Sequence, residues 1–342
     1  MASLTIEAYC AAIRDAIAGN DLALAAQQAR VGLENHPKEP EFAKIEIVAL
    51  IKMEKPAQAL DVLERARGAR LLAPKAMSYE AAYCHFALEN YAKAEDALKS
   101  VEAGPAADRL AAQIAYKSNR FETCIEIYER LLTSVAAASP EHDEILLNLA
   151  AAKAAAAQVA GRKQIGAAAD ALIESYELMF NQATELLAYG QAKEAAKLLE
   201  AAAVRAEAVL TEDNWIAEDI QSEVSTIDAQ RAVALQCLGK ISDARAIYAR
   251  LLSGKSLDRA TRGAVVHNAA VLMARAGGTT DFLLASQIKR AIQIPGTSTS
   301  GLSRYQRALM AYNMAVVQFF QQQFAAARRS LARLASDYPE CA

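Results

Sequence analysis

Apolar residues recur along almost the whole chain at spacings of three and four residues, which is the period of an α-helix. Short polar turns interrupt this pattern. Helix breakers are scarce, with 14 glycines and 8 prolines among 342 residues, and alanine inflates the hydrophobic fraction of 54%. Abundant alanine and few breakers favour helix nearly throughout. The sequence therefore predicts an all-α protein.

A longer repeat is centred on the polar turns. In each copy a polar turn and a large residue or proline precede a small residue, at which two helices can approach closely. The small residues of seven copies are Ala25, Ala59, Ala94, Cys124, Ala195, Ala244 and Ala327. The first four are spaced by 34, 35 and 30 residues, and a helix–turn–helix unit of about 34 residues is the tetratricopeptide repeat (TPR). Because one hairpin cannot bury its apolar face alone, we expect a right-handed superhelical α-solenoid.

The copies predict one curved array rather than separate globular domains. We expect residues 1–342 to form a single TPR array of about nine helix-hairpin units, several of them imperfect. Residues 146–158 predict a first helix whose partner has degenerated. An acidic insert at about 209–227 predicts a solvated loop or a helix extension, and a Gly/Ser/Thr linker is expected at about 292–301.

Charge and cysteine content favour a cytoplasmic protein. The 37 basic and 40 acidic residues give a net charge of −3, and the five cysteines form no C-x-x-C pair. Such spacing is typical of reduced intracellular thiols that serve as small apolar side chains. Glu7 and Asp15 lie where a secretory signal would be uncharged, and no run of about 20 apolar residues lacks charge. We expect no membrane insertion.

Motifs for catalysis or metal binding do not stand out in this sequence. The four histidines are His36, His85, His142 and His267. None of them belongs to an H-E-x-x-H motif, and none has a cysteine at the spacing of a metal-binding pair. Residues 253–256 read SGKS and resemble the end of a phosphate-binding loop. However, Ala249 stands where the first glycine belongs, and a helix rather than a strand precedes them. We interpret SGKS as a turn between repeats, and we expect no enzyme activity, catalytic residue, metal site or cofactor.

Only the C-terminal part of the chain leans basic. Nucleic-acid binding normally requires a basic, salt-sensitive surface, which the slightly acidic chain as a whole lacks. The C-terminal basic residues are Lys289, Arg290, Arg304, Arg307, Arg328, Arg329 and Arg333. We interpret them as a solvated face of the last helices, with a direct RNA contact as the alternative.

The first helices of stacked hairpins are expected to line a groove. An amide recurs at one equivalent position on five successive first helices, at Asn148, Asn181, Gln230, Asn268 and Asn313. An amide can donate to and accept from a peptide backbone without reading its sequence. We expect these amides to line a peptide-binding groove, and hydrogen bonding to a neighbouring helix is the alternative. Rings that could anchor a partner, or fill the core instead, are Tyr79, Tyr83, Phe86 and Tyr116.

The order of the repeats resembles that of a known family. The stretches that carry the likeness are 111–132, 144–155, 174–202 with its SYEL-x-x-N unit, 230–252, and 302–317 with its LS-x-x-Q start. An acidic insert separates the third from the fourth. In this order the chain is similar, over nearly its whole length, to the seventy-two-kilodalton TPR subunits of the eukaryotic signal recognition particle.

The resemblance implies a non-enzymatic scaffold that holds the C-terminal region of the particle's sixty-eight-kilodalton subunit on its repeats. The heterodimer would sit on the particle's RNA and support cotranslational targeting of ribosomes to the endoplasmic reticulum. The family's RNA-binding segment is a lysine-rich stretch beyond the repeats, and the sequence ends at YPECA without it. We therefore expect this chain to reach the particle's RNA only indirectly.

Two other functions stay open at this point. One is a TPR adaptor of the chaperone-cofactor type, which would clamp the C-terminal carboxylate of a partner peptide. Such a clamp needs inward-facing cations on consecutive first helices, where this sequence offers only Arg109. The other is a protein that binds RNA directly.

Overall fold

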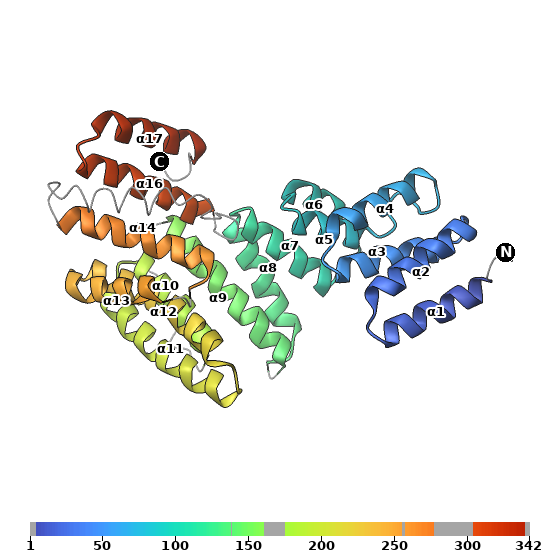
Figure 1. Cartoon of the computed structure of the whole chain (residues 1–342), viewed down its shortest axis with the longest axis horizontal. Coiled ribbons are helices and arrows are strands. Elements are labelled where there is room, and N and C mark those ends of the chain that lie inside the picture. The colour runs from blue at the N-terminus through green and yellow to red at the C-terminus, as the bar shows by residue number, and fades with distance from the viewer. Residues whose placement is uncertain (1–4, 138, 161–174, 255–256, 277–303, 339–342) are drawn as a thin grey trace. The chain divides into compact units, whose positions relative to one another are not determined.

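The computed structural model describes residues 5–137, 139–160, 175–254, 257–276 and 304–338 (Figure 1). Sixteen α-helices follow one another in these ranges, and the described residues contain no β-strand. The predicted all-α class is confirmed. Contacts divide the chain into two compact units, residues 1–136 and 137–342, and each is built from helical hairpins. The joint arrangement of about nine hairpins in one array stays a prediction.

The first unit consists of four hairpins. Its helices are α1 (Ile6–Ala18), α2 (Leu22–Asn35), α3 (Pro40–Lys52), α4 (Pro56–Gly68), α5 (Ser78–Ala87), α6 (Tyr91–Leu98), α7 (Pro105–Lys117) and α8 (Phe121–Ser134). Each helix contacts the next along the chain, and α5 also contacts both α3 and α7. First helices therefore lie beside first helices, as they do where TPR hairpins stack.

The second unit repeats this plan. Its helices in the described ranges are α9 (Pro140–Ala160), α10 (Tyr176–Ala188), α11 (Ala192–Glu212), α12 (Ala217–Cys237), α13 (Ile241–Ser253), α14 (Arg259–Ala276), α16 (Arg304–Phe320) and α17 (Phe324–Asp337). Five of them have 17 to 21 residues, more than any helix of the first unit. Here α12 contacts α10 and α14 as well as its neighbours in sequence. The stacking of alternate helices is thus common to both units.

A residue in the left-handed backbone region marks the turn of seven hairpins. In the α7–α8 turn, Asn119 has φ 57°, and the N–H of Arg120 donates to the carbonyl oxygen of Ala115 at 2.9 Å. This pattern is a Schellman ending, which satisfies the last carbonyl groups of a helix and turns the chain sharply. The seven left-handed residues are Asn20, Glu54, Glu89, Asn119, Gly190, Gly239 and Gln322.

The small residues predicted from the repeat lie at a constant distance from these turns. Each is five residues after the left-handed residue of its hairpin, from Ala25 after Asn20 to Ala327 after Gln322. All seven are 0% to 5% exposed. Their prediction as points of close helix packing is confirmed, and the turn sets which face of the second helix meets the first.

The acidic insert predicted at 209–227 is two helix ends joined by a tight turn. α11 continues to Glu212 and α12 begins at Ala217, so the helix-extension interpretation describes it and the solvated loop does not. The linker predicted at 292–301 lies outside the described residues, as does the segment that follows α9.

The packing at Ala244 leads to a first prediction. Ala244 in α13 is fully buried in a cluster with Ala232 and Leu235 of α12. Leucine at this position should push the helices apart and lower the free energy of unfolding by about 1–3 kcal/mol. Chemical denaturation followed by circular dichroism measures the change.

Ala249→Leu supplies the matched control, because Ala249 is exposed on the same helix. That substitution should change the free energy of unfolding by no more than about 0.5 kcal/mol. Equal stabilities of the two leucine variants would contradict the role assigned to the buried alanine.

Candidate functional site

Three of the five predicted amides share one position relative to the hairpin turn. Asn181, Gln230 and Asn313 each lie nine residues before the left-handed residue that follows their helix. The turns that follow the helices of Asn148 and Asn268 lie outside the described residues. For the three, the equivalence inferred from the repeat therefore holds in the backbone.

Two of the amides are used inside the protein. Gln230 Nε2 donates to Thr184 Oγ1 at 3.4 Å, a bond that joins α12 to α10. The side chain of Asn268 lies beside the hydroxyl group of Tyr248, which is buried in α13 and donates to Gln236 Oε1 at 3.4 Å. These contacts are of the kind expected if the amides serve packing between neighbouring helices.

The remaining three amides differ in how much of each side chain is exposed to solvent. Asn313 is buried, with 9% of its surface exposed. Asn148 on α9 and Asn181 on α10 are half-buried, and their helices lie in contact. Contacts within the described residues give these two amides no hydrogen bond. Asn148 and Asn181 are therefore the best placed of the five to meet a peptide backbone, and that role stays a prediction.

The predicted rings are mostly packed. Tyr79 and Phe86 lie against the core formed by α5, α6 and α7. Tyr116 meets Phe121 edge to face, with the ring centroids 5.5 Å apart. Tyr83 is the most accessible of the four, with 40% of its surface exposed. Three of the rings thus contribute to packing, and Tyr83 can also contact a partner.

An apolar pocket of about 220 Å³ lies between α1, α2 and α3. Its lining residues are Ile17, Leu22, Ala25, Lys44, Ile45, Val48, Ala49 and Lys52. Ile17 is 51% exposed and Val48 is 38% exposed, so solvent reaches the apolar wall. Lys44 also pairs with Glu41, with Nζ 2.6 Å from Oε1. The pocket can accept an apolar side chain of a partner, and none of its residues was identified as a binding residue from the sequence.

This α1–α3 pocket shares the register of the predicted groove residues. Ile45 lies nine residues before the left-handed Glu54, the position that the amides hold in the second unit. Val48 lies six residues before Glu54, as Tyr83 lies six before Glu89. Exposed apolar groups thus occupy the same place on α3 and α5, which are in contact.

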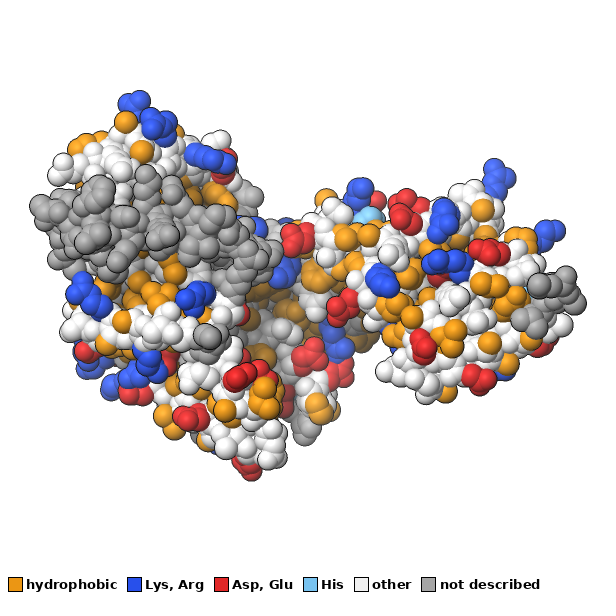
Figure 2. All heavy atoms as spheres, in the orientation of Figure 1, with side chains coloured by type: hydrophobic (Ala, Val, Ile, Leu, Met, Phe, Trp, Pro, Cys, Tyr) orange, Lys and Arg blue, Asp and Glu red, His pale blue; other side chains and the backbone are white. Residues whose placement is uncertain are grey.

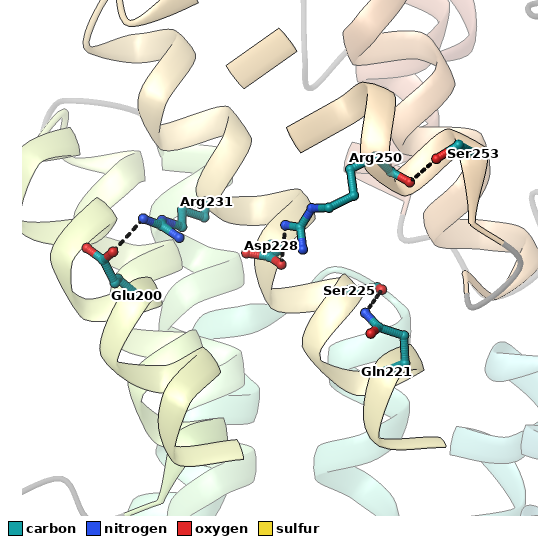
Figure 3. A network of polar contacts seen from close by, with 7 residues as sticks. All are labelled: Glu200, Gln221, Ser225, Asp228, Arg231, Arg250 and Ser253. Carbon is teal, nitrogen blue, oxygen red and sulfur yellow. Dashed lines mark hydrogen bonds and ion pairs between the residues drawn. The ribbon is translucent and has the colours of Figure 1, made fainter. Parts of the chain in front are cut away.

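The polar groups of α12 tie it to both neighbouring helices. Asp228 has a side chain that is only 6% exposed, and its Oδ2 accepts from Arg250 Nη2 of α13 at 2.7 Å (Figure 3). Arg231 Nη2, also on α12, donates to Glu200 Oε1 of α11 at 2.6 Å. Charged side chains here hold neighbouring helices together.

The same ion pair recurs in the first unit. Arg130 Nη2 of α8 donates to Asp108 Oδ1 of α7 at 2.9 Å. Residues 108–130 and 228–250 align without a gap, so the two pairs hold equivalent positions in their hairpins. Because this ion pair recurs at the same position of two hairpins, we interpret it as part of the packing between the two helices of a hairpin.

Burial shifts the pKa values of two thiols and of one histidine. Burial raises the pKa of the Cys84 and Cys124 thiols to about 11, so both are protonated at neutral pH. Burial also lowers the pKa of His267, which keeps its imidazole neutral. Across the described ranges, no group of three or more His, Cys, Asp or Glu residues is placed to hold a metal ion.

The SGKS sequence and the basic C-terminal residues both belong to the second unit. Ser253 ends α13 and Gly254 follows it, while the rest of the SGKS sequence lies outside the described residues. Arg328 and Arg329 are exposed, and Arg333 Nε pairs with Asp337 Oδ2 at 3.2 Å. Every helix in the described ranges is either too short or too polar to cross a membrane.

The turn geometry, the buried small residues and the contacts between alternate helices define a class of protein, the stacked helical hairpins of the TPR type. A family model described as a putative TPR-like repeat matches residues 34–155. More particularly, the chain is similar to subunit SRP72 of the signal recognition particle. The human protein is 28% identical over 304 residues, 86% of this chain, and the Caenorhabditis elegans protein is 25% identical over 310 residues, 90% of this chain.

These matches confirm the resemblance predicted from the order of the repeats. The chain spans 42% of the length of human SRP72 and 46% of the worm protein. Among solved structures, the Cut9–Hcn1 tetramer of the APC/C matches 96% of this chain at 13% identity and a TM-score of 0.39. A chain of the Naa15/Naa10 complex bound to HypK matches 97% at 11% identity and a TM-score of 0.33. At these scores neither structure carries information about function.

The Asp228–Arg250 pair leads to a second prediction. Arg250→Ala leaves the buried carboxylate without this partner, so the free energy of unfolding should fall by about 1–3 kcal/mol. Chemical denaturation measures the change, and Arg245→Ala on an exposed part of the same helix is the control. Adding Asp228→Asn to Arg250→Ala should recover part of the loss. A loss equal to that of Arg245→Ala would show that the pair contributes no stability.

Proposed function

We propose that this chain is a non-enzymatic scaffold subunit of a cytoplasmic signal recognition particle, and that its TPR hairpins bind the C-terminal region of the sixty-eight-kilodalton subunit. The observation that carries the proposal is the similarity to SRP72 over 86% to 90% of the chain. The hairpin geometry supports it, because stacked repeats present an extended surface rather than a catalytic pocket. Association with the endoplasmic reticulum, with ribosomes and with the particle's RNA then follows indirectly, through the assembled particle.

The first unit offers the apolar contacts for such a partner. The α1–α3 pocket has the size and lining to take an apolar side chain, with the half-exposed Ile17 and Val48 in its wall. Tyr83 on α5 adds an accessible ring in the same register. A disordered segment that folds on such a surface offsets its ordering cost by burying a large area. Lys44 and Lys52 favour acidic side chains in the partner beside the apolar one.

The second unit offers hydrogen-bonding groups. Asn148 and Asn181 are half-buried on helices in contact, and each can donate to and accept from a peptide backbone. Each such bond contributes only about 1 kcal/mol net. Their role in the proposal is to hold the backbone of the partner segment, whereas the apolar contacts supply most of the affinity.

The pocket can be tested separately from the rest of the chain. Val48→Asp puts a charge against the apolar wall, so the affinity for a recombinant C-terminal region of the sixty-eight-kilodalton subunit should fall at least about tenfold. Isothermal titration calorimetry measures the affinity.

Leu24→Asp is the control for this pocket variant. Leu24 is 39% exposed, nearly the same as Val48, and it does not line the pocket. Its replacement should leave the affinity within about twofold. No measurable binding by the unaltered chain would reject the proposed function, and equal losses in the two variants would reject the pocket.

The amide prediction is tested by the double variant Asn148→Ala, Asn181→Ala. Loss of up to two backbone hydrogen bonds should weaken binding of the same recombinant segment by about five- to thirtyfold. Gln58→Ala, which removes an exposed amide from a second helix, is the control and should bind normally. Unchanged affinity in the double variant would reject the peptide-binding role of Asn148 and Asn181, even if the pocket variant fails to bind.

A further inference from the structure

The connection between α11 and α12, which joins two successive hairpins, forms a tip that differs from the hairpin turns. Both helices have 21 residues, whereas α7 and α8 have 13 and 14. The turn between them is tight, with Asn214 at φ 59° and the Trp215 N–H donating to the Leu210 carbonyl oxygen at 3.0 Å. Every residue from 211 to 219 is exposed. The tip therefore presents its side chains to solvent on a well-defined backbone.

Two large apolar residues stand next to each other on this tip. Trp215 is 51% exposed and Ile216 is 62% exposed. At the place of Trp215, directly after the left-handed residue, the seven hairpin turns have only polar residues: Asp21, Lys55, Asn90, Arg120, Gln191, Lys240 and Gln323. The end of α4 has the same kind of turn after the left-handed Arg70, and Leu71 at that place is less exposed than Trp215. In Schellman endings the residue at this place often packs on the one five positions earlier, which is the buried Leu210. Packing on Leu210 would cover only one face of the Trp215 indole, and about half of Trp215 is exposed to solvent.

Single exposed apolar residues are ordinary on protein surfaces, and packing on Leu210 could by itself favour an apolar residue at position 215. Ile216 has no such role, since it directly precedes α12 and is the more exposed of the two. Adjacent exposed tryptophan and isoleucine side chains are characteristic of the centre of a protein interface. The apolar pair thus indicates a contact with another molecule.

The charge around the tip indicates the kind of molecule. Residues 206–230 contain seven carboxylates and no lysine, arginine or histidine, in a chain whose net charge is only −3. Four exposed carboxylates flank the apolar pair, Glu212, Asp213, Glu218 and Asp219. Figure 2 shows acidic and apolar side chains together at the lower end of α11 and α12. Such a surface repels RNA and anionic lipid, and it attracts cations.

We propose that the α11–α12 tip is a docking site for a basic amphipathic segment of a partner protein, with Trp215 and Ile216 covered by its apolar side chains and the four carboxylates paired with its lysines and arginines. Tryptophan suits this partner because its ring also attracts guanidinium and ammonium groups. The proposal is independent of the proposed function, since it rests on the tip alone.

Trp215 makes the tip observable in the full chain, because it is the only tryptophan in the sequence. The probe is a synthetic amphipathic helix of leucine and lysine, and its counterpart with glutamate in place of lysine is the control peptide. The leucine–lysine peptide should shift the Trp215 emission to shorter wavelength as it covers the indole. Its affinity should fall several-fold when sodium chloride is raised from low to high concentration. An unchanged emission at saturating peptide, or an equal response to the glutamate peptide, would overturn the proposal.

Variants then locate the site by anisotropy of the dye-labelled peptide. Trp215→Ser with Ile216→Ser should weaken binding at least about tenfold, and Glu218→Gln with Asp219→Asn should weaken it and reduce its salt dependence. The controls are Val204→Ser, which removes an apolar residue 68% exposed on α11, and Glu194→Gln with Asp243→Asn, which removes two exposed carboxylates away from the tip.

Circular dichroism and thermal unfolding confirm that each variant is folded before binding is compared. Equal losses in the tip variants and the controls would show non-specific attraction to an acidic protein and overturn the proposal. Single-stranded RNA and vesicles of phosphatidylserine and phosphatidylcholine are tested as alternative ligands by the same Trp215 emission. Binding of either through Trp215, in place of the basic peptide, would overturn the choice of partner.

Discussion

The close approach of two helices at one small side chain is the constraint on which each hairpin depends. Ala94 and Cys124 are fully buried at that point, and a larger residue would separate the helices and expose the apolar face that the next hairpin covers. The left-handed turn residue five positions earlier decides that this residue, and no neighbour, faces the first helix. Local turn geometry and long-range stacking are therefore coupled through a single register.

That register separates side chains that build the protein from those that can bind. Ion pairs such as Asp108–Arg130 and Asp228–Arg250 recur at equivalent positions and join the helices of one hairpin. By contrast, Val48 and Tyr83 share a position on first helices, and both are exposed. The packing of a hairpin does not require an apolar residue at this exposed position. Conserving the hairpin while varying such positions lets one scaffold present different surfaces, as stacked-repeat proteins generally do.

Spacing and composition were enough to predict the helices, the turns and the small residues, because each of these is determined by neighbours within one hairpin. The partners of Gln230 and Asn268 were beyond such reasoning, because Thr184 and Tyr248 meet them only once different hairpins stack. The α1–α3 pocket was missed for a related reason. Ile45 and Val48 belong to an apolar run whose core-facing and solvent-facing members look alike in sequence. The acidic residues near Glu212 allowed either loop or helix, and two continuous helices formed.

The constant five-residue step from turn to small residue also restricts how such a chain can evolve. Inserting one residue between Asn119 and Cys124 would rotate α8 by about 100° about its axis and turn its apolar side towards water. The connections between hairpins carry no such restriction, and the first four small residues are already 34, 35 and 30 residues apart. Insertions and deletions among homologues are therefore expected to gather between hairpins, so that the chain changes its length without changing the phase of any helix.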